Sequence, residues 1–230
     1  MTRLYTFVGR VCLAATIAIA ALTSALAAAE GPSGEKEATG ISSLDFNKED
    51  ATLSIEWSGP ISPGMADYLH TALDKYGAVS HRVILFLNSA GGRVDEGDRV
   101  IHVLDEVKQT HRLITVVPDG DLCASMCIPI FLQGDDRLAA RTSNWIFHEA
   151  ARQGANRKER TEETLQLFDR YYVRAGVSVH WLERIMPVIK RANLWQTGGD
   201  LISGNTGIVT SPLEKGTERL VPAQRLEKAI

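Results

Sequence analysis

Apolar runs of strand length alternate with amphipathic stretches of helical spacing along the central part of the chain. Alternating apolar and polar residues over 51–57 predict a strand, and apolar residues at helical spacing over 63–74 predict a helix. Strands at 83–87 and 113–117 then flank a helix over 94–108. Near-continuous apolar strands joined by amphipathic helices are typical of a parallel sheet with crossover helices. The sequence therefore predicts an α/β fold.

The second half of the chain continues this pattern. The expected elements are a short helix after Ser125 to about residue 133, strands at 137–140, 145–148 and 207–210, and helices at 159–175 and 177–189. Pro187 is expected to interrupt the last helix, because proline cannot donate an intrahelical hydrogen bond.

The first 27 residues have the pattern of a cleavable targeting segment. Arg3 and Arg10 precede an apolar run over 11–22, and small residues over 24–27 fit an A-x-A cleavage site. A membrane anchor is the alternative, but the apolar run is shorter than the ~20 residues that span a bilayer. We therefore expect cleavage after Ala27 and a periplasmic or secreted protein without a stable membrane span.

The rest of the chain divides into three parts by composition. Residues 28–41 are rich in Gly, Glu, Ala and Ser and are expected to form a disordered lead-in. Residues 42–215 are expected to form one domain, in line with the usual ~100 to 200 residues per domain. Residues 216–230 are expected to be a C-terminal tail.

The charge of the chain argues against a nucleic-acid partner. Cleavage removes Arg3 and Arg10 and no acidic residue, so the formal net charge moves from -3 to -5. A nucleic-acid-binding protein needs a basic face. The short basic cluster at 157–160 is interleaved with and followed by glutamates, which is typical of a solvated helix start.

Three segments could together build a hydrolase site around Ser125. A strand ends in Asn88-Ser-Ala-Gly-Gly, Ser125 follows in Cys-Ala-Ser-Met-Cys, and a later strand ends at His148. A serine nucleophile needs a base for its proton and N–H donors for the oxyanion. Alone, Ser125 is better explained as a helix cap and His148 as a core residue; their order along the chain favours the catalytic interpretation.

Cys123 and Cys127 flank Ser125 and are the two cysteines that remain after cleavage, since Cys12 is lost with the targeting segment. In an exported protein they could form a disulfide, or they could be two small buried residues. A thiol redox protein is a further hypothesis, disfavoured because no C-x-x-C motif is present.

These motifs resemble those of the proteolytic subunit of the Clp protease, in the ClpP/crotonase superfamily, and its exported relatives. The resemblance extends over about residues 53–210 and includes the Gly-Gly turn, the Ala-Ser-Met element and the strand that ends at His148. It implies an α/β fold of repeated β-β-α units, with a mainly parallel sheet and flanking helices.

The resemblance also implies roles for single residues. Ser125 would be the nucleophile and His148 the general base. The oxyanion hole would be formed by the N–H groups of Gly91, Gly92 and Met126. The family's triad aspartate is replaced: counting back from the element that begins at Asp200 leads to Asn193, with Asp200 and Asp169 as the other candidates for orienting His148.

The resulting hypothesis is an exported serine peptidase that acts on a peptide or an unfolded protein, and the resemblance suggests a homo-oligomer. The alternative is a catalytically inactive binding or scaffold protein of the cell envelope with the same fold. An acyl-CoA enzyme of the superfamily is disfavoured by export, and a serine–lysine dyad by the presence of His148. No cofactor is expected, and no metal, because the remaining histidines lack ligand spacing.

Overall fold

The computed structural model describes residues 40–150 and 154–213. The predicted targeting segment 1–27, nearly all of the lead-in 28–41 and the tail 216–230 lie outside the described residues, so these expectations stay predictions.

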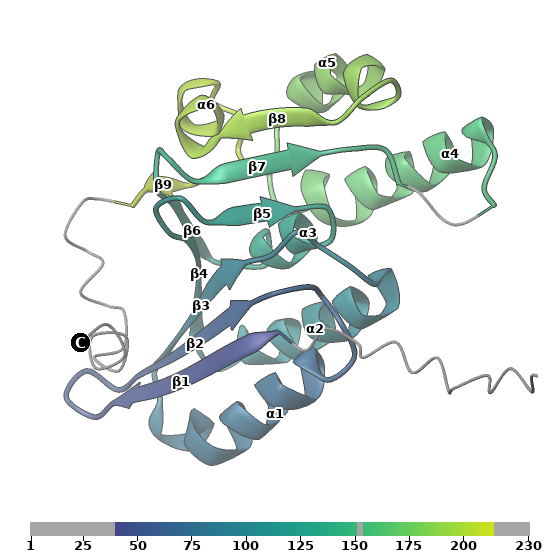
Figure 1. The fold of residues 1–230 in the computed structure, drawn as a ribbon. Helices are drawn as coiled ribbons and strands as arrows, with labels where there is room; N and C mark the ends of the chain where they lie inside the picture. Colours follow the sequence, from purple (N-terminus) through teal and green to yellow (C-terminus); the bar gives the residue numbers. More distant parts are fainter. Residues whose placement is uncertain (1–39, 151–153, 214–230) are drawn as a thin grey trace, which may run out of the picture. The chain divides into compact units, whose positions relative to one another are not determined.

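The described chain alternates between strands and helices (Figure 1). The strands are β1 Ile41–Asn47, β2 Thr52–Ser58, β3 Arg82–Asn88, β4 Arg112–Val117, β5 Leu122–Ala124, β6 Asp136–Ala139, β7 Asn144–Phe147, β8 Leu194–Thr197 and β9 Ser211–Pro212. The helices are α1 Met65–Tyr76, α2 Val94–Val107, α3 Cys127–Phe131, α4 Arg157–Leu167, α5 Val179–Ile189 and α6 Gly198–Ser203, with a 3-10 turn η1 at Gly77–Val79 and a π-helix η2 at Phe168–Val173.

The larger sheet has the strand order β1-β2-β3-β4-β6-β9. Every neighbouring pair from β2 to β9 is parallel, whereas β1 runs antiparallel to β2. The α/β class is therefore confirmed, and the expectation of a mainly parallel sheet holds in part: the described sheet is mixed, because β1 adds an antiparallel edge to parallel strands. The antiparallel β1 follows from a short turn over 48–51, since two strands joined by so short a connection can only pair antiparallel.

The smaller sheet has the order β5-β7-β8, with β5 and β7 parallel and β7 and β8 antiparallel. It connects to the end of β3 through Ser89, whose N–H donates to the Leu122 carbonyl at 2.6 Å. The Ser89 carbonyl in turn accepts from Ala124 N–H at 3.0 Å. This bridge brings the Gly-Gly turn after β3 beside the chain that leads to Ser125.

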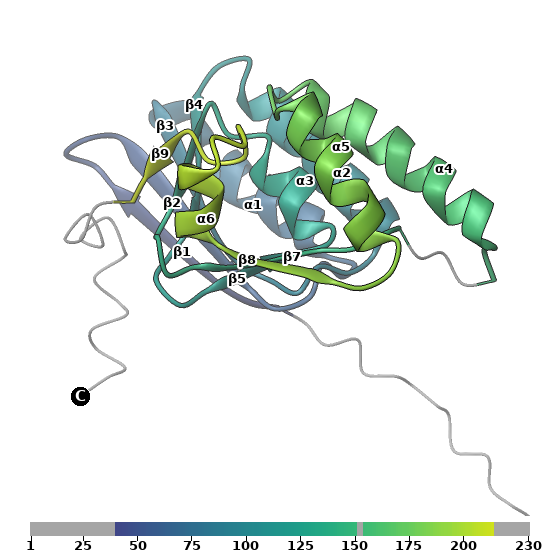
Figure 2. The same ribbon diagram turned by 90° about the horizontal axis from the view of Figure 1, so that it is seen from above.

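The hydrophobic core lies between the strands and the helices. Figure 2 shows the helices on one side of β5, β7 and β8. β3 is buried on both faces, with Leu85 and Leu87 in the main core and Ile84 and Phe86 in a small second cluster. Burial on both faces explains why its sequence is a continuous apolar run rather than an alternating one.

α4 begins with a capping box, in which the Asn156 side chain accepts from Glu159 N–H and the Glu159 side chain accepts from Asn156 N–H. The helix is strongly polar, and Thr164 is its buried residue. The apolar residues expected in one helix over 159–175 belong mostly to η2, where Phe168, Tyr171 and Tyr172 are buried. The single predicted helix is thus an α-helix followed by a π-helical turn.

Two further expectations need correction. The predicted strand at 207–210 is not formed. The buried Arg137 guanidinium donates hydrogen bonds to the carbonyls of Gly207 at 2.9 Å and Ile208 at 2.9 Å, so these carbonyls do not pair with a neighbouring strand. The strand in this region is the short β9. Pro187 does not interrupt α5, which continues to Ile189. Since the helix ends two residues later, the missing proline N–H removes a bond from the last turn alone.

Candidate active site

Ser125 lies at the sharp turn between β5 and α3. Its φ is +53°, in the left-handed region that residues other than glycine rarely adopt. Ser125 N–H donates to the Ile146 carbonyl of β7 at 3.3 Å, and the Ser125 carbonyl accepts from Ile128 N–H at 3.0 Å. A non-glycine residue in this conformation costs of order 1–3 kcal/mol and persists only when its surroundings hold it. Backbone strain of this kind clusters at functional sites.

Gly91 makes room for this turn. A Cβ on Gly91 would lie 2.5 Å from the Ser125 Cβ and 2.7 Å from the Ala124 carbonyl oxygen, closer than real atoms approach. The φ of Gly91 is +90°. The Gly91 N–H donates to Ser89 Oγ at 3.1 Å, so this predicted oxyanion donor already has an acceptor.

Gly92 and Met126 supply the other two predicted donors. Ile61 pairs with the glycine turn through Ile61 N–H to the Gly91 carbonyl at 2.9 Å and through Arg93 N–H to the Ile61 carbonyl at 2.8 Å. Neither bond uses the N–H of Gly92. Met126 immediately precedes α3, where N–H groups have no intrahelical acceptor. Both N–H groups are therefore suited to hold an oxyanion.

One cavity of about 760 Å³ includes Ser125, His148, Gly92 and Met126 in its lining. The side chains that make its wall apolar are Ile128, Pro129, Ile146, Phe147, Leu167 and Phe168. Charged residues of α4 and the following turns also border it, namely Glu163, Asp169, Arg170 and Arg174. The cavity therefore combines an apolar wall with a charged border around the two residues predicted to be catalytic.

His148 follows β7 directly and is half-buried. Its Nδ1 lies 2.7 Å from the carbonyl oxygen of its neighbour Glu149. Across residues 40–150 and 154–213 no hydrogen bond joins Ser125 Oγ to either ring nitrogen of His148. Catalytic hydrogen bonds are often long in a free enzyme and tighten when substrate binds.

The three residues predicted to orient His148 have different positions. Extending the β7–β8 register by one residue places Asn193 opposite His148, but Asn193 is exposed and, within the described residues, contributes no hydrogen bond to the ring. Asp200 caps α6, where hydrogen bonds from Thr197 lower its pKa. Asp169 borders the cavity that contains Ser125 and His148.

Cys123 and Cys127 are joined by a disulfide, and both are fully buried. The bond connects the middle of β5 to the first residue of α3. Its covalent ring encloses Ala124, Ser125 and Met126, and so contains both the candidate nucleophile and one oxyanion donor.

Tyr172 is a buried phenol in the lining of the cavity, and burial raises its pKa. It is therefore neutral at physiological pH. In the described part of the chain, no group of three or more His, Cys, Asp or Glu side chains is arranged to hold a metal ion. No helix in this part is long and apolar enough to cross a membrane.

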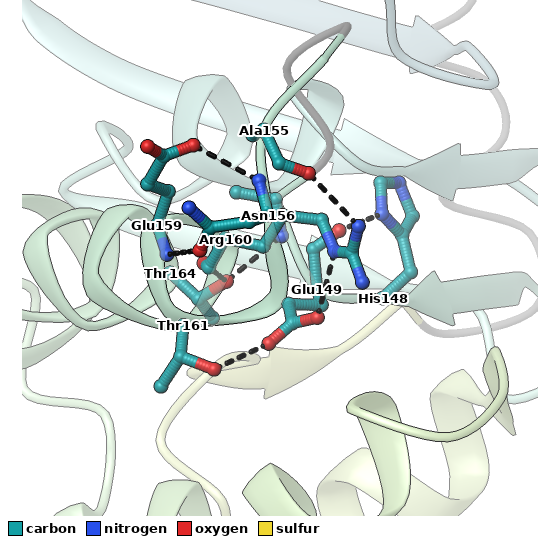
Figure 3. A network of polar contacts seen from close by, with 9 residues as sticks. His148, Glu149, Ala155, Asn156, Glu159, Arg160, Thr161 and Thr164 are labelled. Atoms are coloured by element: carbon teal, nitrogen blue, oxygen red, sulfur yellow. Dashed lines mark hydrogen bonds and ion pairs between the residues drawn. The ribbon is translucent and has the colours of Figure 1, made fainter.

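Three residues near His148 lie outside the set predicted from the sequence, namely Glu149, Thr161 and Thr164. Their side chains connect the segment after β7 to α4 (Figure 3). The sequence carries a signal for the position of α4, the Asn156-x-x-Glu159 capping box, but none for these contacts.

Comparison with solved structures gives the fold a name. A point mutant of ClpP1 from Listeria monocytogenes matches with a TM-score of 0.55, over 74% of this chain and 94% of that chain. The chain has a ClpP-like fold. At 19% sequence identity the likeness shows the fold alone. No protein-family model matches the sequence, and no curated protein does.

Proposed function

We propose that the protein is a serine hydrolase that cleaves peptide bonds through an acyl-enzyme on Ser125, with His148 as general base. One observation carries the proposal: Ser125, His148, Gly92 and Met126 border the same cavity. Nucleophile, base and oxyanion donors are the three parts that acyl transfer requires. The ClpP-like fold is consistent with a peptidase.

In this mechanism His148 Nε2 takes the proton of Ser125 Oγ while the oxygen attacks the substrate carbonyl. The oxygen of the tetrahedral intermediate accepts hydrogen bonds from the N–H groups of Gly92 and Met126. His148 then gives the proton to the departing amine, and a water molecule activated by His148 releases the acyl group.

The substrate in this proposal is a peptide or an unfolded protein. Gly92 lies at the edge of the cavity, and its N–H and carbonyl take no part in the bridge to Ile61. An extended chain can add to such an edge through main-chain hydrogen bonds. The apolar wall formed by Ile128, Ile146 and Phe147 favours an apolar side chain next to the cleaved bond.

Fluorophosphonate labelling of the purified protein tests the activated serine. We expect labelling of the wild type and its loss in Ser125→Ala and His148→Ala. Ser203→Ala and His70→Ala are matched controls, since both residues are exposed on helices away from the cavity. A folded wild type that does not react would overturn the proposal.

A binding or scaffold protein with the same fold is the second candidate. The observation in its favour is that no hydrogen bond joins Ser125 to His148 in the described residues, and that Asn193 gives the ring none there either. The same labelling experiment separates the two candidates, because a binding protein needs no activated hydroxyl.

We also propose that the protein is exported and cleaved after Ala27. The Cys123–Cys127 disulfide supports this, because disulfides persist in oxidising compartments. The N-terminal sequence of the protein purified from its native host is expected to begin at Ala28. A mature protein that retains Met1 in a reducing compartment would contradict export.

Finally, we propose a homo-oligomer. A groove of about 650 Å³ lined by α4, η2 and α5 carries exposed apolar side chains, including Leu165, Val173 and Val179. Exposed apolar groups gathered at one place are typical of interaction surfaces. Light scattering behind size exclusion is expected to give a mass above that of one chain, and Leu165→Glu is expected to lower it.

A further inference from the structure

We infer that the peptide unit between Glu149 and Ala150 orients His148, in the role that a carboxylate has in a Ser-His-Asp triad, and that α4 holds this peptide in place. The effect of this orientation on the reactivity of Ser125 rests on the proposed function. The orientation of the His148 ring does not rest on it and can be measured separately.

The first step is the tautomer of His148. Nδ1 lies 2.7 Å from the Glu149 carbonyl oxygen, and a carbonyl oxygen can only accept a hydrogen bond. In the neutral ring Nδ1 therefore carries the proton, which leaves the lone pair on Nε2. This is the tautomer that a general base needs if Nε2 is to take the serine proton.

The second step concerns the opposite side of the same peptide. The Glu149 carbonyl and the Ala150 N–H belong to one planar unit, so fixing one group fixes the other. Ala150 N–H donates to Thr164 Oγ1 at 2.8 Å. Thr164 Oγ1 in turn donates to the Arg160 carbonyl at 2.8 Å, and the residue is 2% exposed. Thr164 thus holds the peptide from inside α4.

The third step concerns the side chain of Glu149. Its contacts with α4 fix the position of Glu149 at a second point. It is 8% exposed, and its carboxylate accepts from Thr161 Oγ1 at 2.7 Å and from Arg160 Nε at 3.3 Å. Arg160 Nη1 also donates to the Ala155 carbonyl at 3.1 Å (Figure 3). A buried carboxylate with two partners is costly to release, because a lone buried charge is strongly disfavoured.

Together these contacts make Thr164 and Thr161 positioning residues for the base. They act on His148 through the peptide and the carboxylate of Glu149, and neither hydroxyl takes part in the proposed chemistry. The residues expected from the sequence for this role, Asn193, Asp200 and Asp169, give the ring no hydrogen bond in the described structure.

The test compares substitutions that remove one hydroxyl with little change in volume. Thr164→Val removes the acceptor for Ala150 N–H, and Thr164→Ser keeps it. Thr71→Val on α1 is the matched control, because Thr71 Oγ1 also donates to the carbonyl four residues earlier, at 2.8 Å. Unlike Thr164, Thr71 is exposed and lies far from His148 along the chain. Thr161→Val provides a second, independent variant should Thr164→Val fail to fold.

Two quantities are measured for each variant. The ¹⁵N shifts of the His148 ring, assigned by their absence in His148→Ala, report which nitrogen carries the proton in the neutral ring. The rate constant of fluorophosphonate labelling reports the reactivity of Ser125. General bases contribute about 10²- to 10⁴-fold, so a misdirected ring is expected to slow labelling about tenfold.

We expect wild type, Thr164→Ser and Thr71→Val to have the proton on Nδ1 and to react at similar rates. Thr164→Val and Thr161→Val are expected to show a mixture of tautomers and slower labelling. An unchanged tautomer in both folded valine variants would overturn the inference while leaving the hydrolase proposal intact. A wild type that does not label but has its proton on Nδ1 would overturn the hydrolase proposal and support the inferred orientation.

Discussion

Gly91 lies so close to Ser125 that a single added carbon atom at the glycine would meet the serine Cβ at 2.5 Å. The turn after β3 and the turn after β5 therefore determine each other's position. The geometry of the candidate nucleophile depends on a glycine more than thirty residues earlier in the chain.

Gly91→Ala is expected to lower the rate of fluorophosphonate labelling by about a hundredfold, since a shift of about 1 Å in a reacting group can cost that much. The rate constant of labelling measures this. Gly120→Ala is a matched control: Gly120 also has a positive φ, +72°, but a Cβ there meets nothing within 4 Å. Gly120→Ala is expected to label like the wild type. An equal loss in the two variants would show that backbone strain, rather than contact with Ser125, is the cause, and a Gly91→Ala variant that labels like the wild type would contradict the prediction.

Reduction of the Cys123–Cys127 disulfide is expected to slow labelling of Ser125. The bond holds the residues on both sides of a turn that is unfavourable for serine, so its loss allows the turn to relax. Loop entropy predicts a loss of about 2 kcal/mol in the free energy of unfolding for so short a ring. Urea unfolding and labelling, each with and without reductant, measure both effects.

The control for this experiment is the double variant Cys123→Ala/Cys127→Ala. It is expected to behave like the reduced wild type and not to respond to reductant. A double variant that labels as fast as the oxidised wild type would show that the bond is irrelevant to the site.

Arg137→Met is expected to lower the free energy of unfolding by about 3 kcal/mol, because buried carbonyls lose a charged donor. The Arg137 guanidinium donates to the carbonyls of Ile208, Gly207 and Ala175, at 2.9, 2.9 and 3.0 Å. Burial lowers the pKa of this guanidinium, yet arginine stays charged at any ordinary pH. Urea unfolding measures the loss, and Arg112→Met, at an exposed ion pair, is expected to cost far less.

Tyr171 is expected to make unfolding sensitive to alkaline pH. Burial and the hydrogen bond from its hydroxyl to Asp98 raise the pKa of Tyr171 from 10.0 to about 12. Since the folded state holds the proton more tightly, the stability from this residue is complete below pH 10 and is lost as pH rises toward about 12.

The unfolding temperature, followed from about pH 9 to about pH 12, measures this dependence. Tyr171→Phe is expected to reduce the decline of the unfolding temperature with rising pH. Absorbance of the ionised phenol follows the titration directly. A wild type whose Tyr171 titrates near its ordinary pKa of 10.0 in the folded state would contradict the assignment.

The parts of the fold predicted correctly are those determined by local pattern. β3 and β4 are long apolar runs, and α2 has a clear apolar side, so each could be inferred from its own residues. β9 could not, because the carbonyls near it are taken by Arg137, a residue about seventy positions away. β1 depends on pairing with β2 rather than on its own weak alternation.

The same distinction applies to the candidate site. Ser125 and His148 follow the ends of strands, and their order along the chain was enough to predict that they share one site. Both line the same cavity. The orienting group could not be predicted from side chains, since the acceptor beside the His148 ring is a backbone carbonyl. Thr164 gains its role from the packing of α4 beside the end of β7, which no local pattern records.

The ring closed by Cys123 and Cys127 fixes the length of the turn that it encloses. Three residues lie between the cysteines, and one of them is the candidate nucleophile. An inserted or deleted residue would change the size of the ring and displace Ser125 from the Ile146 carbonyl. Relatives of this protein that keep both cysteines should therefore vary in the identity of the enclosed residues but not in their number.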